Sequence, residues 1–172
     1  MDDSVVRAVA RWPDVPAVYG WLLLDRRGEW RIRVGPEETV SFERIGNAAL
    51  REFIARNYAS DEHGRWYFQN GPQRVFVRLG YTPRVWRLDG EHLRDQCGQA
   101  AQAPLEAWLD EEGSLILADR GGIGVLDDRD LARAAEQIVD ETISIGGIEV
   151  KLGTIVGSEI AQRFGFQREP QP

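Results

Sequence analysis

The sequence has little cysteine and histidine, and these shortages exclude whole classes of protein. Cys97 is the single cysteine among 172 residues, so no intramolecular disulfide can form, and this usage fits a reducing compartment. His92 and Cys97 are neighbours, but they cannot make a zinc site alone, because zinc needs at least three protein ligands. We therefore expect no metal site, no cofactor and a cytoplasmic location.

Long apolar runs are also missing. The longest, Trp21-Leu22-Leu23-Leu24, is far shorter than the roughly 18 residues of a membrane span. The beginning of the chain is acidic and has no apolar segment, so we expect neither a signal peptide nor a membrane partner. The apolar fraction of 42% and charged fraction of 28% are those of an ordinary globular protein.

Lysine is almost absent too, since Lys151 is the single lysine. The charged residues are also unevenly distributed along the chain. The net charge is -7, which argues against general nucleic-acid binding. Residues 1–88 nevertheless hold 14 Arg against 11 Asp and Glu, whereas residues 89–172 hold 6 Arg and 1 Lys against 17 acids. The arginines suit planar, bidentate or stacking contacts, or they reflect a high-GC genome, which their spread along the whole chain favours.

The most distinctive stretch runs from Gly64 to Leu88 and alternates polar and apolar residues on both sides of Asn70-Gly71. That dipeptide suits a tight hairpin turn, and the alternation predicts two strands that lead into a third. Period-two geometry predicts a core face made by Trp66, Phe68, Val75, Val77 and Leu79. The opposite face then carries Arg65, Tyr67, Gln69, Arg74, Phe76 and Arg78.

The remaining elements follow from turn residues and periodicity. We expect a short helix or arm within residues 1–16. Strands are predicted over 17–24 and 29–34, and the second of them should turn Trp30, Ile32 and Val34 toward the core. A segment that crosses to the next helix follows over 37–44. We expect helices after Asn47, over 91–96, after Asp127 or Asp128, and over 158–164 capped by Ser158. Further strands are predicted over 114–118, 142–145 and 148–152.

These elements predict an α+β fold of antiparallel β-hairpins with two main helices. Each half is predicted to have the element order ββαββ. This similarity reflects either a diverged duplication or the turn and strand patterns that all β-hairpins share. We favour duplication, with the two halves packed as one body. Residues 1–90 form the Arg- and aromatic-rich half, 91–104 a linker or short helix, and 105–172 the acidic half of the same globular unit.

Some segments resemble a known family. The Trp21-Leu22-Leu23-Leu24-Asp25 strand and turn, the Arg-rich strands and Arg163-Phe164-Gly165-Phe166 resemble an uncharacterised proteobacterial family known as a domain of unknown function. The resemblance spans most of the chain. It implies no activity, so it assigns no functional residue.

Catalytic patterns are weak throughout the sequence. Five residues apart on a helix, His92 and Cys97 would point in different directions. The glycine-rich Arg120–Gly124 segment lacks phosphate-loop spacing and reads as a tight turn. The carboxylates Asp127, Asp128 and Asp130 lack EF-hand spacing and suit a helix start.

The candidate binding site is therefore the polar side of the first-half sheet. Its members are Arg31, Arg33, Arg65, Tyr67, Arg74, Phe76 and Arg78. Such a face could hold an acidic protein surface, this chain's own acidic half, or a nucleotide, or it could be a solvated face where arginines lie across rings. We favour a binding or adaptor protein. The alternative is an enzyme acting on a small anionic substrate held by these arginines, with a carboxylate as acid or base.

Overall fold

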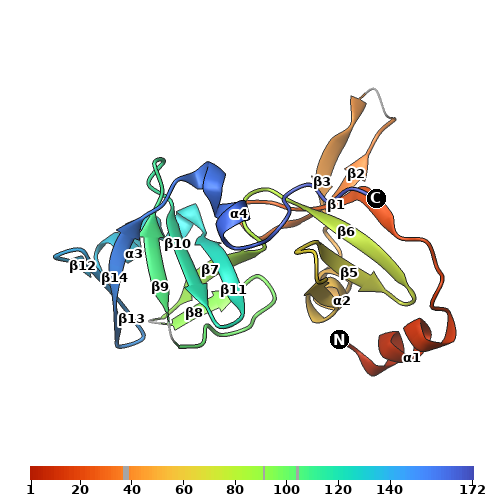
Figure 1. Ribbon diagram of the computed structural model, residues 1–172, viewed down its shortest axis with the longest axis horizontal. Coiled ribbons are helices and arrows are strands. Elements are labelled where there is room, and N and C mark those ends of the chain that lie inside the picture. The colour runs from red at the N-terminus through yellow and green to blue at the C-terminus, as the bar shows by residue number, and fades with distance from the viewer. Residues whose placement is uncertain (37–38, 91, 104) are drawn as a thin grey trace. The chain divides into compact units, whose positions relative to one another are not determined.

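The computed structural model describes residues 1–36, 39–90, 92–103 and 105–172 (Figure 1). The chain separates into two compact units. The first comprises Met1–Asp25, Glu29–Gly80 and Gly165–Pro172, and the second comprises Arg26–Gly28 and Tyr81–Phe164. The first unit thus ends near Gly80, and residues 165–172, which we expected in the acidic half, return to it. Each unit is described by itself.

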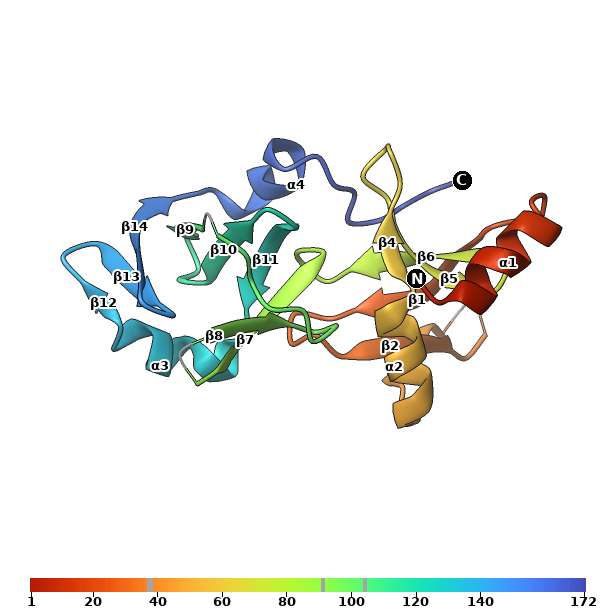
Figure 2. The same cartoon turned by 90° about the horizontal axis from the view of Figure 1, so that it is seen from below.

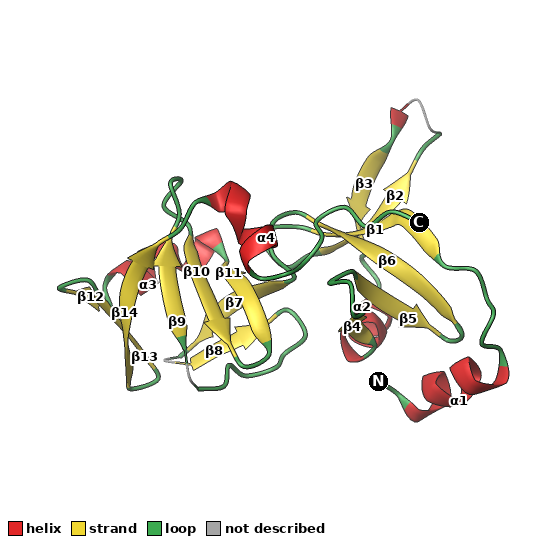
Figure 3. Cartoon of the chain, in the orientation of Figure 1, coloured by secondary structure: helices red, strands yellow, loops and turns green. Residues whose placement is uncertain are grey.

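Strands predominate over short helices, which makes this an α+β protein rich in β structure (Figure 3). Among the described residues, six strands form the sheet of the first unit, in the order β3-β2-β1-β6-β5-β4. The first group is β1 (Val18–Leu24), β2 (Trp30–Val34) and β3 (Ser41–Arg44). The second group is β4 (Tyr58–Ser60), β5 (Trp66–Asn70) and β6 (Gln73–Leu79). Both groups are antiparallel meanders, and β1 pairs with β6 in parallel.

Two helices accompany this sheet. The helix α1 (Asp3–Arg11) confirms the short helix predicted near the start of the chain. The helix α2 (Ala48–Arg56) joins the two meanders and lies against β5 (Figure 2). Asn47 caps α2 as predicted, because its side chain accepts a hydrogen bond from the N–H of Leu50 at 3.1 Å. None of the helices in the described ranges is long and apolar enough to cross a membrane.

The core of the first unit lies between α2 and one side of the sheet. Phe53 of α2 meets Phe68 of β5 edge to face, with ring centroids 5.4 Å apart. The predicted core face is confirmed for its central members, since Phe68, Val77 and Leu79 are buried. Ile32 was predicted to face the core and is instead 42% exposed, because it lies in β2 near the sheet edge formed by β3.

The second unit also forms a mixed sheet, which curves into a half-barrel (Figure 1). Within the described residues it has eight strands in the order β12-β13-β14-β9-β10-β11-β7-β8. The bounds are β7 (Arg84–Asp89), β8 (His92–Asp95), β9 (Glu106–Leu109), β10 (Leu115–Asp119), β11 (Gly122–Leu126), β12 (Ile138–Val139), β13 (Thr142–Ile145) and β14 (Ile148–Thr154). The helices are η2 (Asp128–Asp130), α3 (Leu131–Ala135), η3 (Gly157–Glu159) and α4 (Ile160–Arg163). Its core gathers Trp86, Leu115, Leu117, Leu126 and Ile143.

The two units share one strand order. In the first, β1 to β3, α2 and β4 to β6 give the order β3-β2-β1-β6-β5-β4. In the second, β9 to β11, α3 and β12 to β14 give β11-β10-β9-β14-β13-β12, again with the central pair parallel. The prediction of ββαββ in each half missed the third strand of each meander, since those strands are short or, in β11, rich in glycine.

One tight turn recurs in both units. At Asp25, Asp61, Asp95 and Asp110 the N–H of the aspartate donates to the carbonyl of the residue four positions later. The aspartate side chain accepts the N–H of that same later residue at 2.7–2.9 Å. The glycine three positions after each aspartate has a positive φ of 71–79°, which glycine adopts without steric cost.

Several local predictions were wrong. The hairpin turn is centred on Gly71-Pro72 instead of Asn70-Gly71, because Asn70 pairs with Gln73 as the last residue of β5. The helix predicted over residues 91–96 is replaced by the strand β8 and the Asp95 turn, and residue 91 lies outside the described residues. Ser158 lies inside the helical turn η3, which has no side-chain cap. Residues 41–44 of the expected crossing segment form the strand β3, while residues 37–38 lie outside the described ranges.

Candidate functional site

The sheet of the first unit brings the predicted binding residues onto one side. The Arg/aromatic face consists of Arg31, Arg33, Arg65, Tyr67, Arg74, Phe76 and Arg78. The register pairs Tyr67 with Phe76, Leu23 with Arg78, and Leu23 with Arg31. Paired residues of neighbouring strands point to the same side of a sheet, so alternation within β2 and β6 adds Arg33 and Arg74. Arg65 precedes β5 and reaches this side through its guanidinium.

Aromatic rings form the floor of this face. Tyr19 of β1 stacks on Phe76 with ring centroids 4.6 Å apart, and Tyr67 meets Phe76 edge to face. Arg65 lies 4.7 Å over the ring of Phe76, and Arg74 lies 4.6 Å over that of Tyr67. Tyr67 and Phe76 are therefore buried, although the strand alternation predicted them on the outer side. The arginines and neighbouring rings cover them.

Two acidic residues of the first unit form ion pairs with arginines of the Arg/aromatic face and neutralise part of its positive charge. Arg31 Nε lies 2.6 Å from Asp25 Oδ2, and Arg65 Nε lies 2.8 Å from Asp61 Oδ2. Burial raises the pKa of the Asp61 carboxyl, but the N–H and guanidinium of Arg65 outweigh it and hold that pKa below its ordinary value. These two arginines are thus fixed in place. Arg33 and Arg74 have no carboxylate partner among the described residues, and their guanidinium groups lie over rings.

The return segment (Gly165–Pro172) belongs to the first unit and ends near β1 (Figure 1). It lies on the Arg/aromatic side of the sheet, because Glu169 and Pro170 line a hollow together with Phe76 and Arg78. Its first part is held by backbone: Gln167 donates to Gly64 O at 3.0 Å, and Leu79 donates to Arg168 O at 2.8 Å. Phe166 is buried. This part therefore anchors the segment beside the end of β6.

The second part of the return segment is held by side chains of the Arg/aromatic face. Arg78 Nη2 lies 2.7 Å from Glu169 Oε1, in an ion pair whose side chains are 51% and 60% exposed. Pro170 is buried, and Arg65 Nη1 donates to the Gln171 carbonyl at 3.4 Å. The sheet face thus already holds an acidic, proline-containing segment of its own chain.

A hollow of about 420 Å³ opens between the return segment and the sheet. Its lining combines rings, arginines and the segment itself, and includes Tyr19, Arg33, Phe42, Phe76, Arg78, Glu169 and Pro170. Apolar walls with a few charged groups are typical of a site that binds a ligand in a defined orientation. The hollow joins Arg33, Phe76 and Arg78 of the predicted site, while Arg31, Arg65, Tyr67 and Arg74 do not line it.

Sequence reasoning missed Tyr19 and Phe42. The signal for Tyr19 was present, since Tyr19, Trp21 and Leu23 alternate in β1 with the buried Leu22 and Leu24. Phe42 lies in the strand β3, which was read as a crossing segment, and it pairs with Arg33. The return segment gave no signal, because its contacts join residues that are distant in sequence.

The other predicted chemical features have structural roles. Burial raises the pKa of the Cys97 thiol to about 12, so this cysteine is not an activated nucleophile. His92 is exposed in β8, and Cys97 lies in the turn that follows. The glycine-rich segment is the predicted tight turn, formed between β10 and β11, where Gly122 has a φ of 125°.

Arginines surround the carboxylates near η2. Asp127 pairs with Arg129, Asp128 with Arg27 at 2.7 Å, and Asp130 with Arg87 at 2.6 Å. The hydrogen bond from Arg27 is the main cause that lowers the pKa of Asp128 to about 2. Among the described residues, no group of His, Cys, Asp and Glu is arranged to hold a metal ion.

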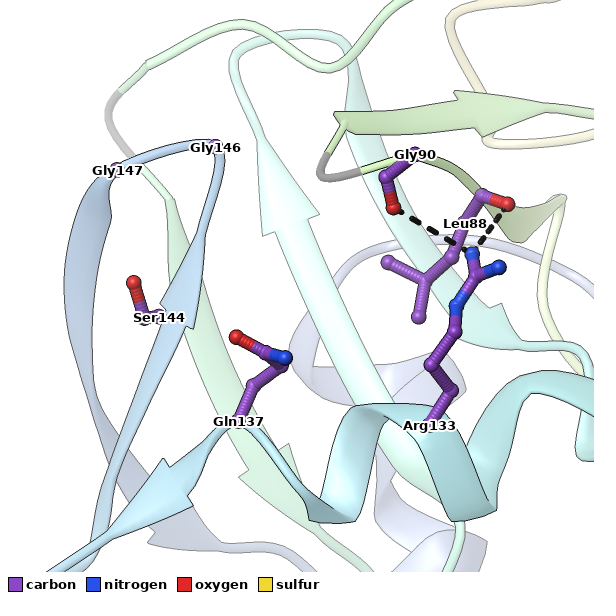
Figure 4. Close-up of a pocket in the computed structure, with 7 residues that line it drawn as sticks. All are labelled: Leu88, Gly90, Arg133, Gln137, Ser144, Gly146 and Gly147. Carbon is purple, nitrogen blue, oxygen red and sulfur yellow. Dashed lines mark hydrogen bonds between the residues drawn. The ribbon is translucent and has the colours of Figure 1, made fainter.

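A smaller hollow of about 260 Å³ lies in the second unit (Figure 4). Figure 4 shows Arg133 reaching the carbonyls of Leu88 and Gly90, at 2.5 and 3.5 Å, with Gln137 and Ser144 on the other wall. Gly146 and Gly147 form the turn at its edge. The guanidinium of Arg133 already donates to carbonyls, and Gln137 and Ser144 are exposed. This hollow therefore offers fewer available and enclosed polar groups to a ligand than the hollow of the first unit.

Comparison with known proteins defines the family and the fold. A solved structure described as a DUF1285 family protein from Silicibacter pomeroyi DSS-3 is similar, with a TM-score of 0.55 and 17% sequence identity over 90% of this chain and 97% of that chain. At this identity the likeness concerns the fold alone. No curated protein matches the sequence. Residues 1–171 match the family described as protein of unknown function (DUF2946), and the chain therefore belongs to that family.

Proposed function

We propose that this protein is a binding or adaptor protein that receives an acidic, extended partner segment on the Arg/aromatic face of its first unit. The observation that carries the proposal is the hollow beside Arg33 and Arg78, where cations stand at the edge of a floor made by Tyr19 and Phe76. Guanidinium groups bind carboxylates with directed hydrogen bonds, and the rings supply apolar contact area. The single cysteine supports a cytoplasmic site of action.

The shared strand order offers an internal comparison. By sheet register, Leu24 with Trp30 corresponds to Leu109 with Leu115, and Leu24 with Leu79 corresponds to Leu109 with Thr154. The counterparts of the face residues then follow by counting along each strand. Arg31, Arg33, Arg74, Phe76 and Arg78 correspond to Ile116, Ala118, Glu149, Lys151 and Gly153. The fold therefore does not require arginine at these places, which supports a role in binding.

The same comparison supports a duplication. Both units place a tight Asp-x-x-Gly turn after the first strand of the first meander, at Asp25 and at Asp110. We infer that a βββαβββ unit was duplicated and that only the first copy carries the arginines and rings. The alternative, in which the face has no ligand and its arginines simply lie across rings in water, explains the positions of Arg65 and Arg74. It gives no role to the hollow beside Arg33.

The enzyme alternative finds less support. Among the described residues that line the hollow, Glu169 is the acid, and it is exposed and paired with Arg78. General acid or base catalysis calls for a carboxyl whose surroundings tune its pKa, usually through burial. The lining suits recognition of charge rather than proton transfer.

The test is binding of a fluorescently labelled acidic peptide, rich in Glu and Pro, to the full chain at low salt. The double variant Arg33→Glu/Arg78→Glu should bind at least about tenfold more weakly, the loss that corresponds to about 1.4 kcal/mol. The matched control is Arg7→Glu on α1, which leaves the face intact. Equal binding by the double variant and the control would reject the face as the binding site.

A further inference from the structure

The return segment shows what kind of ligand the hollow accepts. Its anchored part, residues 165–168, is held by backbone hydrogen bonds to Gly64 and Leu79 and by the buried Phe166. Beyond it, the segment places one carboxylate on Arg78, one buried proline at the wall of the hollow and one carbonyl on Arg65. This arrangement resembles a bound peptide.

The polar contacts that hold residues 169–171 are weak. The pair between Arg78 and Glu169 is half exposed on both sides, and exposed ion pairs contribute little stability. The bond from Arg65 to the Gln171 carbonyl is long, at 3.4 Å. Pro170 fixes its own φ, which lowers the backbone entropy that binding removes. A competing segment therefore needs to replace few contacts.

We propose that the hollow binds, in place of residues 169–171, an extended partner segment in which an acidic residue is followed by proline. The acid meets Arg78, the proline enters the space beside Tyr19 and Phe76, and a backbone carbonyl accepts from Arg65. A second acid in the partner finds Arg33, which lines the same hollow. The return segment is then the internal occupant that such a partner displaces. This inference rests on the proposed function and names its ligand.

The charges of the first unit favour this partner over a nucleic acid. Asp25 and Asp61 lie beside Arg31 and Arg65, and they fix those guanidinium groups while reducing the positive charge that a phosphate backbone would need. The net charge of -7 also opposes polyanion binding. A peptide with one or two carboxylates matches the arginines that remain.

The experiment uses the full chain and a labelled synthetic peptide that copies residues 165–172. The opened variant Glu169→Lys/Pro170→Gly weakens the internal contacts, and its fold is checked by circular dichroism and thermal unfolding. If it is unstable, the milder Glu169→Gln takes its place. We expect the opened variant to bind the peptide at least about fivefold more tightly than the natural chain, and we expect Arg78→Gln in the opened variant to remove that binding. A control peptide carries Lys for Glu and Gly for Pro, and it should not bind.

Equal affinity of the natural chain and the opened variant would overturn the inference, and so would binding that persists after Arg78→Gln. If a general acidic peptide binds through Arg33 and Arg78 but the peptide copying residues 165–172 does not bind the folded opened variant, this inference fails and the proposed function stands. If neither peptide binds, both fail.

Discussion

Tyr19 and Phe76 stack nearly parallel, with an interplanar angle of 11° and ring centroids 4.6 Å apart. They lie on the adjacent strands β1 and β6, which belong to different meanders of the first unit and pair in parallel. The stack therefore joins the two meanders at the centre of the sheet and forms the floor of the candidate site.

Truncating this floor should cost both stability and binding. Phe76 is 2% exposed, so Phe76→Ala should lower the free energy of unfolding by about 3–4 kcal/mol. Phe76→Leu keeps most of the volume and should cost less than about 1.5 kcal/mol while still removing the stack. Urea unfolding followed by tryptophan fluorescence measures both. Equal costs for the two variants would show that the ring is not packed as described.

The contact between Gly64 and Gly165 should control the return segment. A Cβ on Gly64 would lie 1.9 Å from the Gly165 carbonyl oxygen, and its φ is +71°. Gly64→Ala should therefore displace the segment and expose Phe166. It should lower the free energy of unfolding by at least about 2 kcal/mol more than an alanine that only has to adopt a positive φ. Gly113→Ala is the matched control, since its φ is +79° and nothing lies within 4 Å of its Cβ.

Trypsin reports the displacement directly. We expect cleavage after Arg168 to be faster in Gly64→Ala than in Gly113→Ala, because Arg168 is held by hydrogen bonds to Leu79 and Gly80. Identical cleavage and identical unfolding free energies in the two variants would contradict the placement of the segment.

Asp110 should contribute to stability in a pH-dependent way. Burial raises its pKa, but hydrogen bonds from the Tyr81 hydroxyl at 2.6 Å and the Ser114 N–H at 2.7 Å outweigh burial and leave the pKa below its ordinary value. A carboxyl with a lower pKa in the folded state stabilises fully above its unfolded pKa of about 3.9, and this contribution is lost as the pH falls through the folded pKa.

The variant Asp110→Asn should accordingly be less stable at neutral pH, and its unfolding free energy should fall less steeply between about pH 5 and pH 2. Glu62→Gln is the control, since the Glu62 side chain is 87% exposed. Urea unfolding at several pH values gives the slopes. A slope for Asp110→Asn equal to that of the natural chain would show that Asp110 is not held as a carboxylate.

The sequence predicted the features that depend on local rules. Period-two alternation placed Tyr67 and Phe76 on one side of the sheet and Phe68 and Val75 on the other, because strand geometry fixes the side to which each residue points. Asn47 was recognised as a helix cap, since a cap is a local hydrogen bond. The strands over residues 142–145 and 148–152 were found because their β-branched residues flank a glycine pair.

Other features depended on contacts that no local rule contains. The strands β3 and β11 were missed, one because it is short and polar and one because its glycines indicate a turn. The polar residues 92–95 resemble a helix start, but their pairing with β7 makes them a strand. The return segment reaches the Arg/aromatic face only through tertiary contacts, so sequence reasoning predicted the arginines and missed their internal partner.

The most direct test of the Arg/aromatic face follows the arginine side chains themselves. Nitrogen-resolved NMR of the guanidinium Nε–H groups, assigned by single arginine variants, is recorded while an acidic proline-containing peptide is added to the full chain. The signals of Arg33, Arg65 and Arg78 should shift together and saturate, while those of Arg84 and Arg129, which pair with acids of the second unit, should stay in place. Shifts confined to Arg84 and Arg129, or no shifts at all, would contradict the face as the binding surface.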